Sequence, residues 1–152
     1  MPIAQINIAR MLAPLDDAKM KEFRDFLAPV NQLAESSEGF LWRYSDENAH
    51  QFEMPWDDEM VIVNLSVWRD VAALQDFTYQ TVHAYFVRSR KKWFHQLGHP
   101  HYVLWWVADG HIPSLVEAKA KLELIAANGP TREAFLFQHA AMYPKLGNTA
   151  NT

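Results

Sequence analysis

The sequence predicts an α+β fold of four strands and two helices, followed by a helical extension. Apolar and polar residues alternate at 3–10, 40–44 and 61–68, which is typical of strands with one buried side. Apolar residues recur at helical spacing after the first and third of these segments. A fourth strand, rich in aromatic residues, is predicted at 102–108. At 152 residues, the chain has the length of about one domain.

Polar residues occupy one side of the first predicted strand. Ile6 and Ile8 point to one side, and Gln5 and Asn7 point to the other. Asn64 has a similar place in the third strand. An asparagine that is buried and unpaired costs about 1–3 kcal/mol, so each one needs a partner. That partner is a protein group, a water molecule or a ligand, and the sequence leaves these alternatives open.

The first predicted helix begins after Asp16–Asp17, because carboxylates favour the positive end of a helix dipole. Its apolar positions continue to Glu35. Pro29 lies inside this pattern, so we expect a kink or a break there. Glu38–Gly39 then forms a turn.

Aromatic residues mark the second strand and the connection that follows it. Phe40, Trp42 and Tyr44 are predicted to share one side of the strand. The connection at 45–59 is polar and longer than a usual hairpin loop, which suggests a binding or lid segment. Trp56 within it is a candidate wall of a pocket.

Val61–Trp68 is the clearest strand, and Asp70 caps the helix after it. We expect this second helix to run to about Gln96, with a break near Thr78–Gln80. The order strand, helix, strand, strand, helix, strand is the ferredoxin-like βαββαβ plan.

The whole chain, 1–152, is predicted to be a single domain. It comprises a ferredoxin-like core at 1–109 and a C-terminal extension at 110–152. Ser114 and Glu117 form a capping box for a helix in this extension. An open four-stranded sheet would leave one aromatic face bare, so we expect a homodimer.

Composition and charge exclude several classes of partner. The net charge of −4 offers no general attraction for nucleic acid or anionic membranes. The chain contains no cysteine, so disulfides and thiolate metal sites are excluded. There is no secretory signal pattern and no apolar run near the ~20 residues of a membrane span. We therefore expect a cytoplasmic protein whose partners are itself and a small molecule.

The second helix carries a mixed stripe of aromatic and ionisable residues. Its members follow helical spacing: Tyr79, His83, Phe86, Arg90 and Phe94. His83 can act as a base, an acid or a metal ligand, or it can be a hydrogen-bonded structural histidine. Arg90 turned inward needs carboxylate or carbonyl partners, which a ligand would supply, or it forms an ion pair within the chain, for example with an aspartate of the loop after the second strand.

Two other groups of ionisable residues have simpler interpretations. The residues of the second helical stripe indicate a solvated basic face rather than an anion site: Arg88, Lys91, Lys92 and His95. The histidines around Gly98–Pro100 match no known ligand motif and indicate a surface loop rather than a metal site: His95, His99 and His101. Nucleotide-binding and hydrolase motifs are absent from the sequence.

Several motifs resemble the dimeric α+β-barrel superfamily, which includes antibiotic-biosynthesis-type and haem-degrading monooxygenases. They are W-R-D-x-x-A-L from Trp68 and F-x-Y-x-x-x-H from Phe77. Over most of the chain the sequence resembles one bacterial family of this superfamily, which is known only as a domain of unknown function. The segments that carry this closer resemblance are N-I-A-R at 7–10, G-F-L-W-R at 39–43, N-L-S-V-W at 64–68 and W-W-V-x-x-G-H-I-P at 105–113.

The resemblance implies a homodimer in which two sheets form a barrel, with a pocket between the sheet and the helices of each subunit. In the haem-degrading members a strand asparagine, a helical tryptophan and an iron-ligating histidine line the pocket. Asn7 matches the asparagine, and His83 matches the histidine with a shorter spacing from Trp68. Phe77 stands near the tryptophan position and lacks the indole N–H, which argues against haem cleavage more than against haem binding.

The leading hypothesis is a monooxygenase-like enzyme that acts on an aromatic or polyketide-like molecule, with haem as its cofactor or with none. His83 would be the axial iron ligand or the base, Asn7 and Asn64 would orient substrate or dioxygen, and Arg90 would hold a carboxylate or propionate. The remaining pocket residues would be Trp56, Trp68, Phe77, Tyr79 and Phe86. The alternatives are a non-catalytic dimeric ligand-binding protein and a cofactor-free isomerase or dehydratase with His83 as base.

Overall fold

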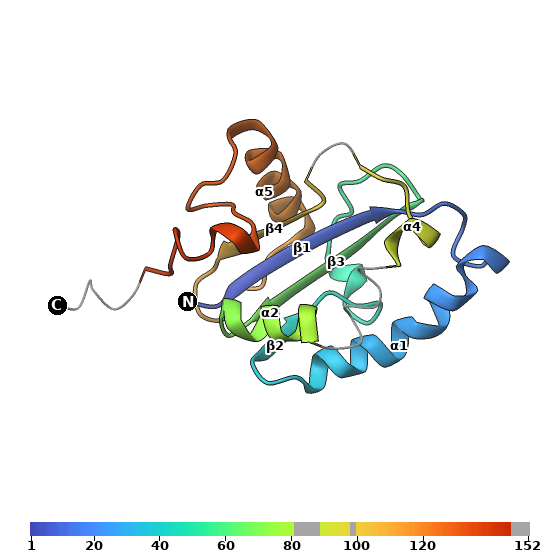
Figure 1. The fold of residues 1–152 in the computed structure, drawn as a ribbon, viewed down its shortest axis with the longest axis horizontal. Coiled ribbons are helices and arrows are strands. Elements are labelled where there is room, and N and C mark those ends of the chain that lie inside the picture. Colours follow the sequence, from blue (N-terminus) through green and yellow to red (C-terminus); the bar gives the residue numbers. More distant parts are fainter. Residues whose placement is uncertain (81–88, 98–99, 147–152) are drawn as a thin grey trace.

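The computed structural model describes residues 1–80, 89–97 and 100–146 (Figure 1). The strands are β1 (Ile3–Arg10), β2 (Phe40–Arg43), β3 (Val61–Trp68) and β4 (Tyr102–Trp106). The α-helices are α1 (Lys21–Ser36), α2 (Val71–Gln80), α4 (Arg90–Trp93) and α5 (Leu115–Asn128). Short 3-10 helices are η1 (Ala18–Met20), η2 (Ala49–Gln51) and η3 (Phe137–His139).

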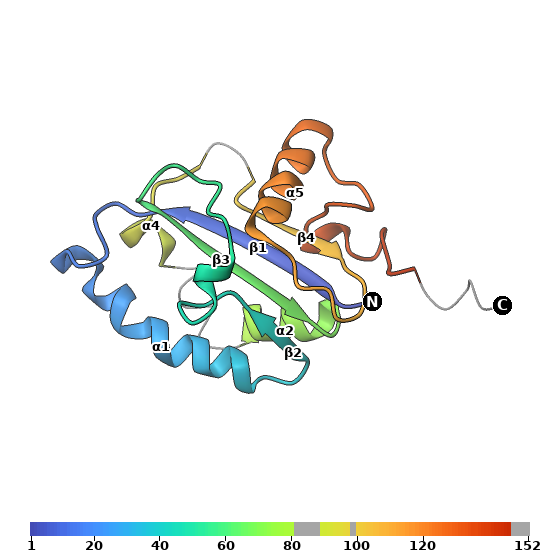
Figure 2. The ribbon, with the colours of Figure 1, turned by 180° about the vertical axis from the view of Figure 1, so that it is seen from behind.

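The strands form one antiparallel sheet in the order β2-β3-β1-β4. This order and the sequence of elements confirm the α+β, ferredoxin-like βαββαβ plan with a C-terminal helical extension. Helices α1 and α2 lie on one face of the sheet, and α5 lies on the other (Figures 1 and 2). We refer to these as the helix face and the α5 face.

Alternation along the strands assigns side chains to the two faces. On the helix face, Ile3, Trp68 and Leu104 pack with buried residues of α1 and α2. On the α5 face, Ile6 and Trp105 pack against the apolar side of α5: Leu115, Ala118, Leu122 and Ile125. Because the extension supplies α5, the sheet is covered on both faces within one chain.

The expectation of a bare aromatic face is therefore wrong. Leu65, Val103 and Trp105 on the α5 face are each almost completely buried. Phe52 and Trp56 of the connection after β2 also pack against the core cluster on this face. The physical reason is that the extension and this connection already bury the surface that a second copy was expected to cover.

The second strand differs from its predicted pattern. Phe40 pairs with Trp68 on β3, whereas Trp42 pairs with the adjacent Val67, so the register shifts at Leu41. Phe40 consequently packs on the helix face, and Trp42 packs with Tyr44 on the α5 face. The prediction that these three aromatic residues share one side is wrong because a bulge changes the two-residue period.

The helices of the core differ from the prediction in two respects: α1 has no break, and α4 ends earlier than expected. Helix α1 continues through Pro29 without a break, and Asp17 caps the short η1 before it, accepting a hydrogen bond from Lys19 N. Asp70 caps α2 as predicted, accepting from Ala73 N at 2.8 Å. Helix α4 ends at Trp93, short of the predicted end, because Phe94 enters a β-bridge with Met11.

Turn and cap residues confirm one smaller prediction and half of another. Gly39 has a φ of 86°, and a Cβ built there would lie 2.5 Å from Cβ of Ala73, so this turn requires glycine. Ser114 Oγ accepts a hydrogen bond from Glu117 N at 3.0 Å, as expected at the start of α5, whereas the Glu117 carboxylate contacts Trp105 Nε1 and His111 Nε2 instead of completing the capping box. In the described part of the chain, none of the helices combines the length and hydropathy of a membrane span.

Candidate functional site

A row of polar side chains crosses the helix face of the sheet. Gln5 and Ser66 are opposite each other in the β1–β3 register, and Asn7 and Asn64 form the next pair on the same face. Gln5 is only 7% exposed and links the other side chains of the row by hydrogen bonds. Its Nε2 donates to Asn64 Oδ1 at 2.7 Å and to Ser66 Oγ at 2.8 Å. Cross-strand hydrogen bonds therefore fix these side chains in place.

The two asparagines of this row, Asn7 and Asn64, each have a polar atom that can form a further hydrogen bond. Asn7 Nδ2 donates to Gln5 Oε1 at 3.4 Å, and Asn64 uses its Oδ1 to accept from Gln5. Within the described residues, Asn64 Nδ2 and Asn7 Oδ1 have no hydrogen-bond partner. Asn7 is half-buried and Asn64 is exposed, so both amides are accessible to a ligand.

Trp68 and Phe77 close one end of the row. Their rings stack at 5.2 Å between centroids with an interplanar angle of 27°. Trp68 is 1% exposed, and its Nε1 donates to Ser66 Oγ at 2.9 Å. Phe77 is buried in the same cluster. These two predicted pocket residues thus lie together in the core, where they support the polar row.

Arg90 on α4 is a half-buried cation at the other end. Its Cζ lies 5.6 Å from the centroid of the Phe94 ring, and burial lowers the pKa of the guanidinium. No carboxylate among the described residues forms an ion pair with it. Asp58 of the loop, an acid of the type proposed as its partner, pairs with Arg10 instead. The positive charge of Arg90 is therefore available to an anionic ligand.

Packing places α4 close to the polar row. Phe94 shares a core cluster with Ala9, and Ile62 packs against the same cluster. Ala9 and Ile62 form the pair that follows Asn7 and Asn64 on the helix face. One such step along a strand is about 7 Å. Helix α4, which carries Arg90, therefore packs against the part of the sheet next to Asn7 and Asn64.

The described members of the predicted helical stripe do not all share one packing environment. Phe94 packs with Phe23 at 5.0 Å, whereas Tyr79 contacts Phe137 of the extension at 5.5 Å. Tyr79 and Phe94 thus belong to different packing environments. His83 and Phe86 lie outside the described residues.

Trp56 does not belong to this site. It packs on the α5 face, whereas the polar row lies on the helix face. The prediction that Trp56 and Trp68 line one pocket is therefore wrong. The physical reason is that the connection after β2 crosses the α5 face, a direction that local sequence patterns do not encode.

The structure adds three residues to the site: Gln5, Ser66 and Tyr102. Gln5 and Ser66 share the two-residue period of Asn7 and Asn64, so this period was the available signal. Tyr102 is opposite Asn7 on β4, and burial raises the pKa of its phenol.

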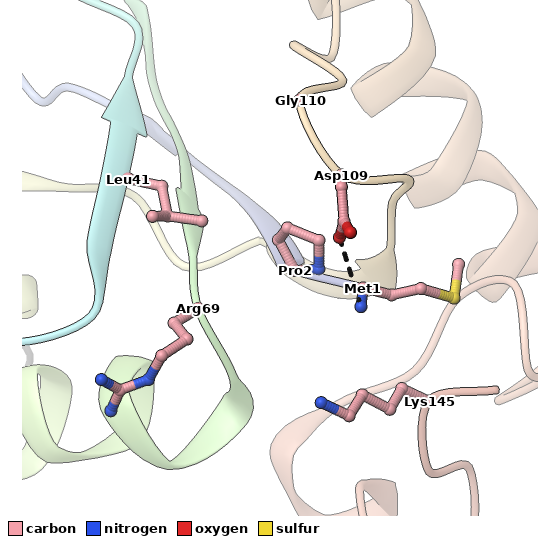
Figure 3. A pocket seen from close by; sticks show the side chains of 7 residues that line it. All are labelled: Met1, Pro2, Leu41, Arg69, Asp109, Gly110 and Lys145. Carbon is pink, nitrogen blue, oxygen red and sulfur yellow. Dashed lines mark ion pairs between the residues drawn. The ribbon is translucent and has the colours of Figure 1, made fainter. Parts of the chain in front are cut away.

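Two surface depressions lie elsewhere on the described part of the chain. One, of about 360 Å³, lies between Leu41, Arg69, Asp109 and Lys145 (Figure 3). The amino group of Met1 pairs with Asp109 on one side of it at 3.4 Å. The other, of about 340 Å³, lies beside α2 and also includes Arg69, which pairs with Glu38 and Asp70. Most of the charge in both depressions is thus already neutralised internally.

The described histidines and carboxylates form no cluster suited to a metal ion. Of the three predicted surface histidines, His95 is exposed, His101 is half-buried against Tyr102, and His99 lies outside the described residues. The chemistry offered by the helix face is therefore neutral hydrogen bonding beside one cation. Such a set can orient a carbonyl or hydroxyl oxygen and bind a carboxylate.

Solved structures with a similar fold come from three bacteria. A Nitrosomonas europaea protein of unknown function, NE2512, has a TM-score of 0.51 at 13% identity, over 74% of this chain and 95% of its own. SnoaB, a cofactor-independent oxygenase from Streptomyces nogalater, has a TM-score of 0.48 at 17% identity, over 74% and 98%. PA3566 from Pseudomonas aeruginosa has a TM-score of 0.47 at 15% identity, over 70% and 95%. The first likeness supports the fold alone.

No curated protein matches the chain in sequence. A family model described as a domain of unknown function, DUF3291, matches residues 2–150. This match covers almost the whole chain and confirms the family resemblance that the sequence motifs indicate. The chain therefore belongs to the DUF3291 family.

Proposed function

We propose that the helix face binds a flat aromatic small molecule that carries both an oxygen substituent and a carboxylate. The observation that carries this proposal is the pair of accessible amides, Asn7 and Asn64, on the face where α4 packs, together with Arg90 of α4, which has no carboxylate partner among the described residues. The amides match a carbonyl or hydroxyl group, and the guanidinium matches the carboxylate.

The charge of Arg90 is the strongest support for an anionic ligand. Burying a cation without a counter-charge is unfavourable, and a carboxylate would supply charge-assisted hydrogen bonds that no carboxylate of the described residues supplies. Its neighbour Phe94 gives the guanidinium an aromatic surface but no negative charge. A ligand carboxylate would therefore complete this end of the site.

The reaction class that we propose is monooxygenase-like turnover of an aromatic or polyketide-like substrate. Asn7 and Asn64 would orient the substrate oxygen, and His83 would act as the base, a role that remains a sequence-based prediction. The described residues of the row are neutral amides and hydroxyls, which support binding and orientation. Because this fold hosts unrelated chemistries, binding without turnover is the main alternative.

Haem is a second candidate ligand, since it is a flat macrocycle with two carboxylates. Arg90 fits a propionate, and His83 would be the iron ligand. Bound haem would supply the activation of dioxygen. Phe77, near the position where the haem-degrading enzymes have tryptophan, is buried against Trp68 and offers no N–H to such a ligand.

The amide contribution can be tested with two fluorescent acids, 2-naphthoate and 1-hydroxy-2-naphthoate, which differ by one hydroxyl. We expect Asn64→Leu to weaken binding of the hydroxylated acid about tenfold and to leave 2-naphthoate nearly unchanged, because only the former loses a hydrogen bond. Gln5 keeps Ser66 as acceptor, so the sheet should remain intact. Fluorescence titration gives the dissociation constants.

Asn128→Leu is the matched control, because Asn128 is exposed at the end of α5. Failure of the wild-type protein to bind either acid would refute the proposed ligand class. Hemin is titrated in parallel, and a Soret band that disappears in His83→Ala would select haem. Oxygen consumption with a bound acid would separate turnover from binding alone.

We also propose the predicted homodimer, now through the outer edge of β2. This strand lies at the end of the sheet, and its Leu41 is 53% exposed. Light scattering at micromolar concentration is expected to give twice the mass of one chain, and Leu41→Lys to reduce it to one. A wild-type monomer would contradict this proposal.

A further inference from the structure

The C-terminal segment after α5 is firmly attached to the edge of the sheet at β4 (Figure 1). Phe135 exchanges two backbone hydrogen bonds with Leu104, at 2.8 and 3.0 Å. Further along, Tyr143 O accepts a hydrogen bond from Trp106 Nε1 at 2.9 Å. The residues between these two anchors are thus held next to the helix face.

Phe137, between those anchors, joins the segment to both the sheet and α2. Its ring lies 5.5 Å from the Tyr79 ring and 5.7 Å from the Tyr102 ring. Its backbone N–H donates to the Tyr102 hydroxyl at 3.3 Å. Phe137 is therefore wedged between an aromatic residue of the helix layer and one of the sheet.

This aromatic group adjoins the polar row. Tyr102 is directly opposite Asn7 in the β1–β4 register, so both side chains emerge from the same face. Asn7 is thus flanked by Asn64 on one neighbouring strand and by Tyr102 on the other. Tyr79 is 53% exposed, so part of its surface remains accessible for stacking with a ligand.

We infer that the C-terminal segment forms one wall of the binding site and that Phe137 sets the size of the ring system that fits there. This inference rests on the proposed function and adds a limit on the ligand: a ring system that extends past Asn7 toward Tyr102 meets the Phe137 side chain, so a three-ring acid is expected to bind less well than a two-ring acid. Removing the phenyl ring opens space of about one ring next to Tyr102. The carboxylate end at Arg90 is unaffected, because Arg90 lies in a different packing environment from Phe137.

The test compares 2-naphthoate with anthracene-2-carboxylate, two fluorescent acids that differ by one fused ring. In Phe137→Ala, the affinity for the three-ring acid relative to the two-ring acid is expected to rise about tenfold, because apolar pockets discriminate by roughly this factor when their size changes. Met142→Ala is the control, since Met142 lies in the same segment and is 66% exposed. Its ratio should equal that of the wild type.

Two results would overturn the inference, and they have different meanings. If the wild type binds 2-naphthoate and Phe137→Ala leaves the ratio unchanged, Phe137 sets no size limit, while the proposed function stands. If the wild type binds neither acid, the proposed function fails and the inference fails with it. Phe137→Leu keeps an apolar side chain at this position, so it provides the same comparison, with a smaller expected rise, should the alanine variant not fold.

Discussion

Replacing Arg90 by glutamine is expected to weaken the binding of 2-naphthoate about 100-fold. The guanidinium is half-buried and has no carboxylate partner among the described residues, so its charge-assisted bonds are available to the ligand. Glutamine keeps a polar side chain of similar reach but loses the charge. Fluorescence titration of the wild type and the variant measures the loss directly.

A neutral probe separates the charge from the shape of the site. Binding of 2-naphthol, which lacks the carboxylate, is expected to change less than about threefold in Arg90→Gln. Lys91→Gln removes a neighbouring charge from α4 and is the matched control, because Lys91 is exposed and its charge is screened by solvent. Equal losses for 2-naphthol and 2-naphthoate would show that Arg90 supports the fold rather than the ligand.

The thermal stability of Arg90→Gln is a second measurement, and it is expected not to fall although ligand binding weakens. Most substitutions at half-buried positions destabilise a protein, but removing a desolvated charge that has no partner can be neutral or stabilising. The thermal midpoint of Arg90→Gln is therefore expected to equal or exceed that of the wild type. Weaker ligand binding together with undiminished stability is the pattern of a binding residue.

The central strands could be predicted from the sequence because their pattern is local. Polar residues recur at every second position in the middle of residues 3–10 and 61–68, and β1 and β3 begin and end at the predicted residues. The shift at Leu41 was not predictable, because it depends on how β2 pairs with β3. The end of α4 depends likewise on the bridge between Phe94 and Met11. Both are consequences of tertiary pairing that a single segment does not contain.

In the candidate site, too, the residue types could be predicted from the sequence, whereas their arrangement depends on tertiary structure. Asn7 and Asn64 were identifiable as polar residues within apolar strands, but only the strand register places them opposite each other. Gln5 was identifiable as polar, and its role as the connecting residue depends on its hydrogen bonds to β3. Trp56 was assigned to the wrong face, because the path of a loop over a sheet is decided by packing.

Phe135→Ala is expected to lower the free energy of unfolding by about 4 kcal/mol. The Phe135 side chain is completely buried among Leu104, Trp106 and Tyr143, so its removal leaves a large cavity. For a chain of this length the thermal midpoint should fall by about 10 °C. Leu146→Ala is the control, since Leu146 lies in the same C-terminal part and is 62% exposed.

The shape of the unfolding curve then tests whether the extension and the core form a single domain. Helix α5 covers one face of the sheet, and the segment at Phe135 extends its edge, so the core at 1–109 would expose apolar surface without 110–152. We therefore propose that the chain unfolds in one cooperative transition, and that Phe135→Ala shifts this transition as a whole. A separate early transition in the variant, with the main one unmoved, would instead show that the extension melts independently. The wall at Phe137 would then be present only while that extension is folded, and ligand affinity would fall with temperature before the sheet unfolds.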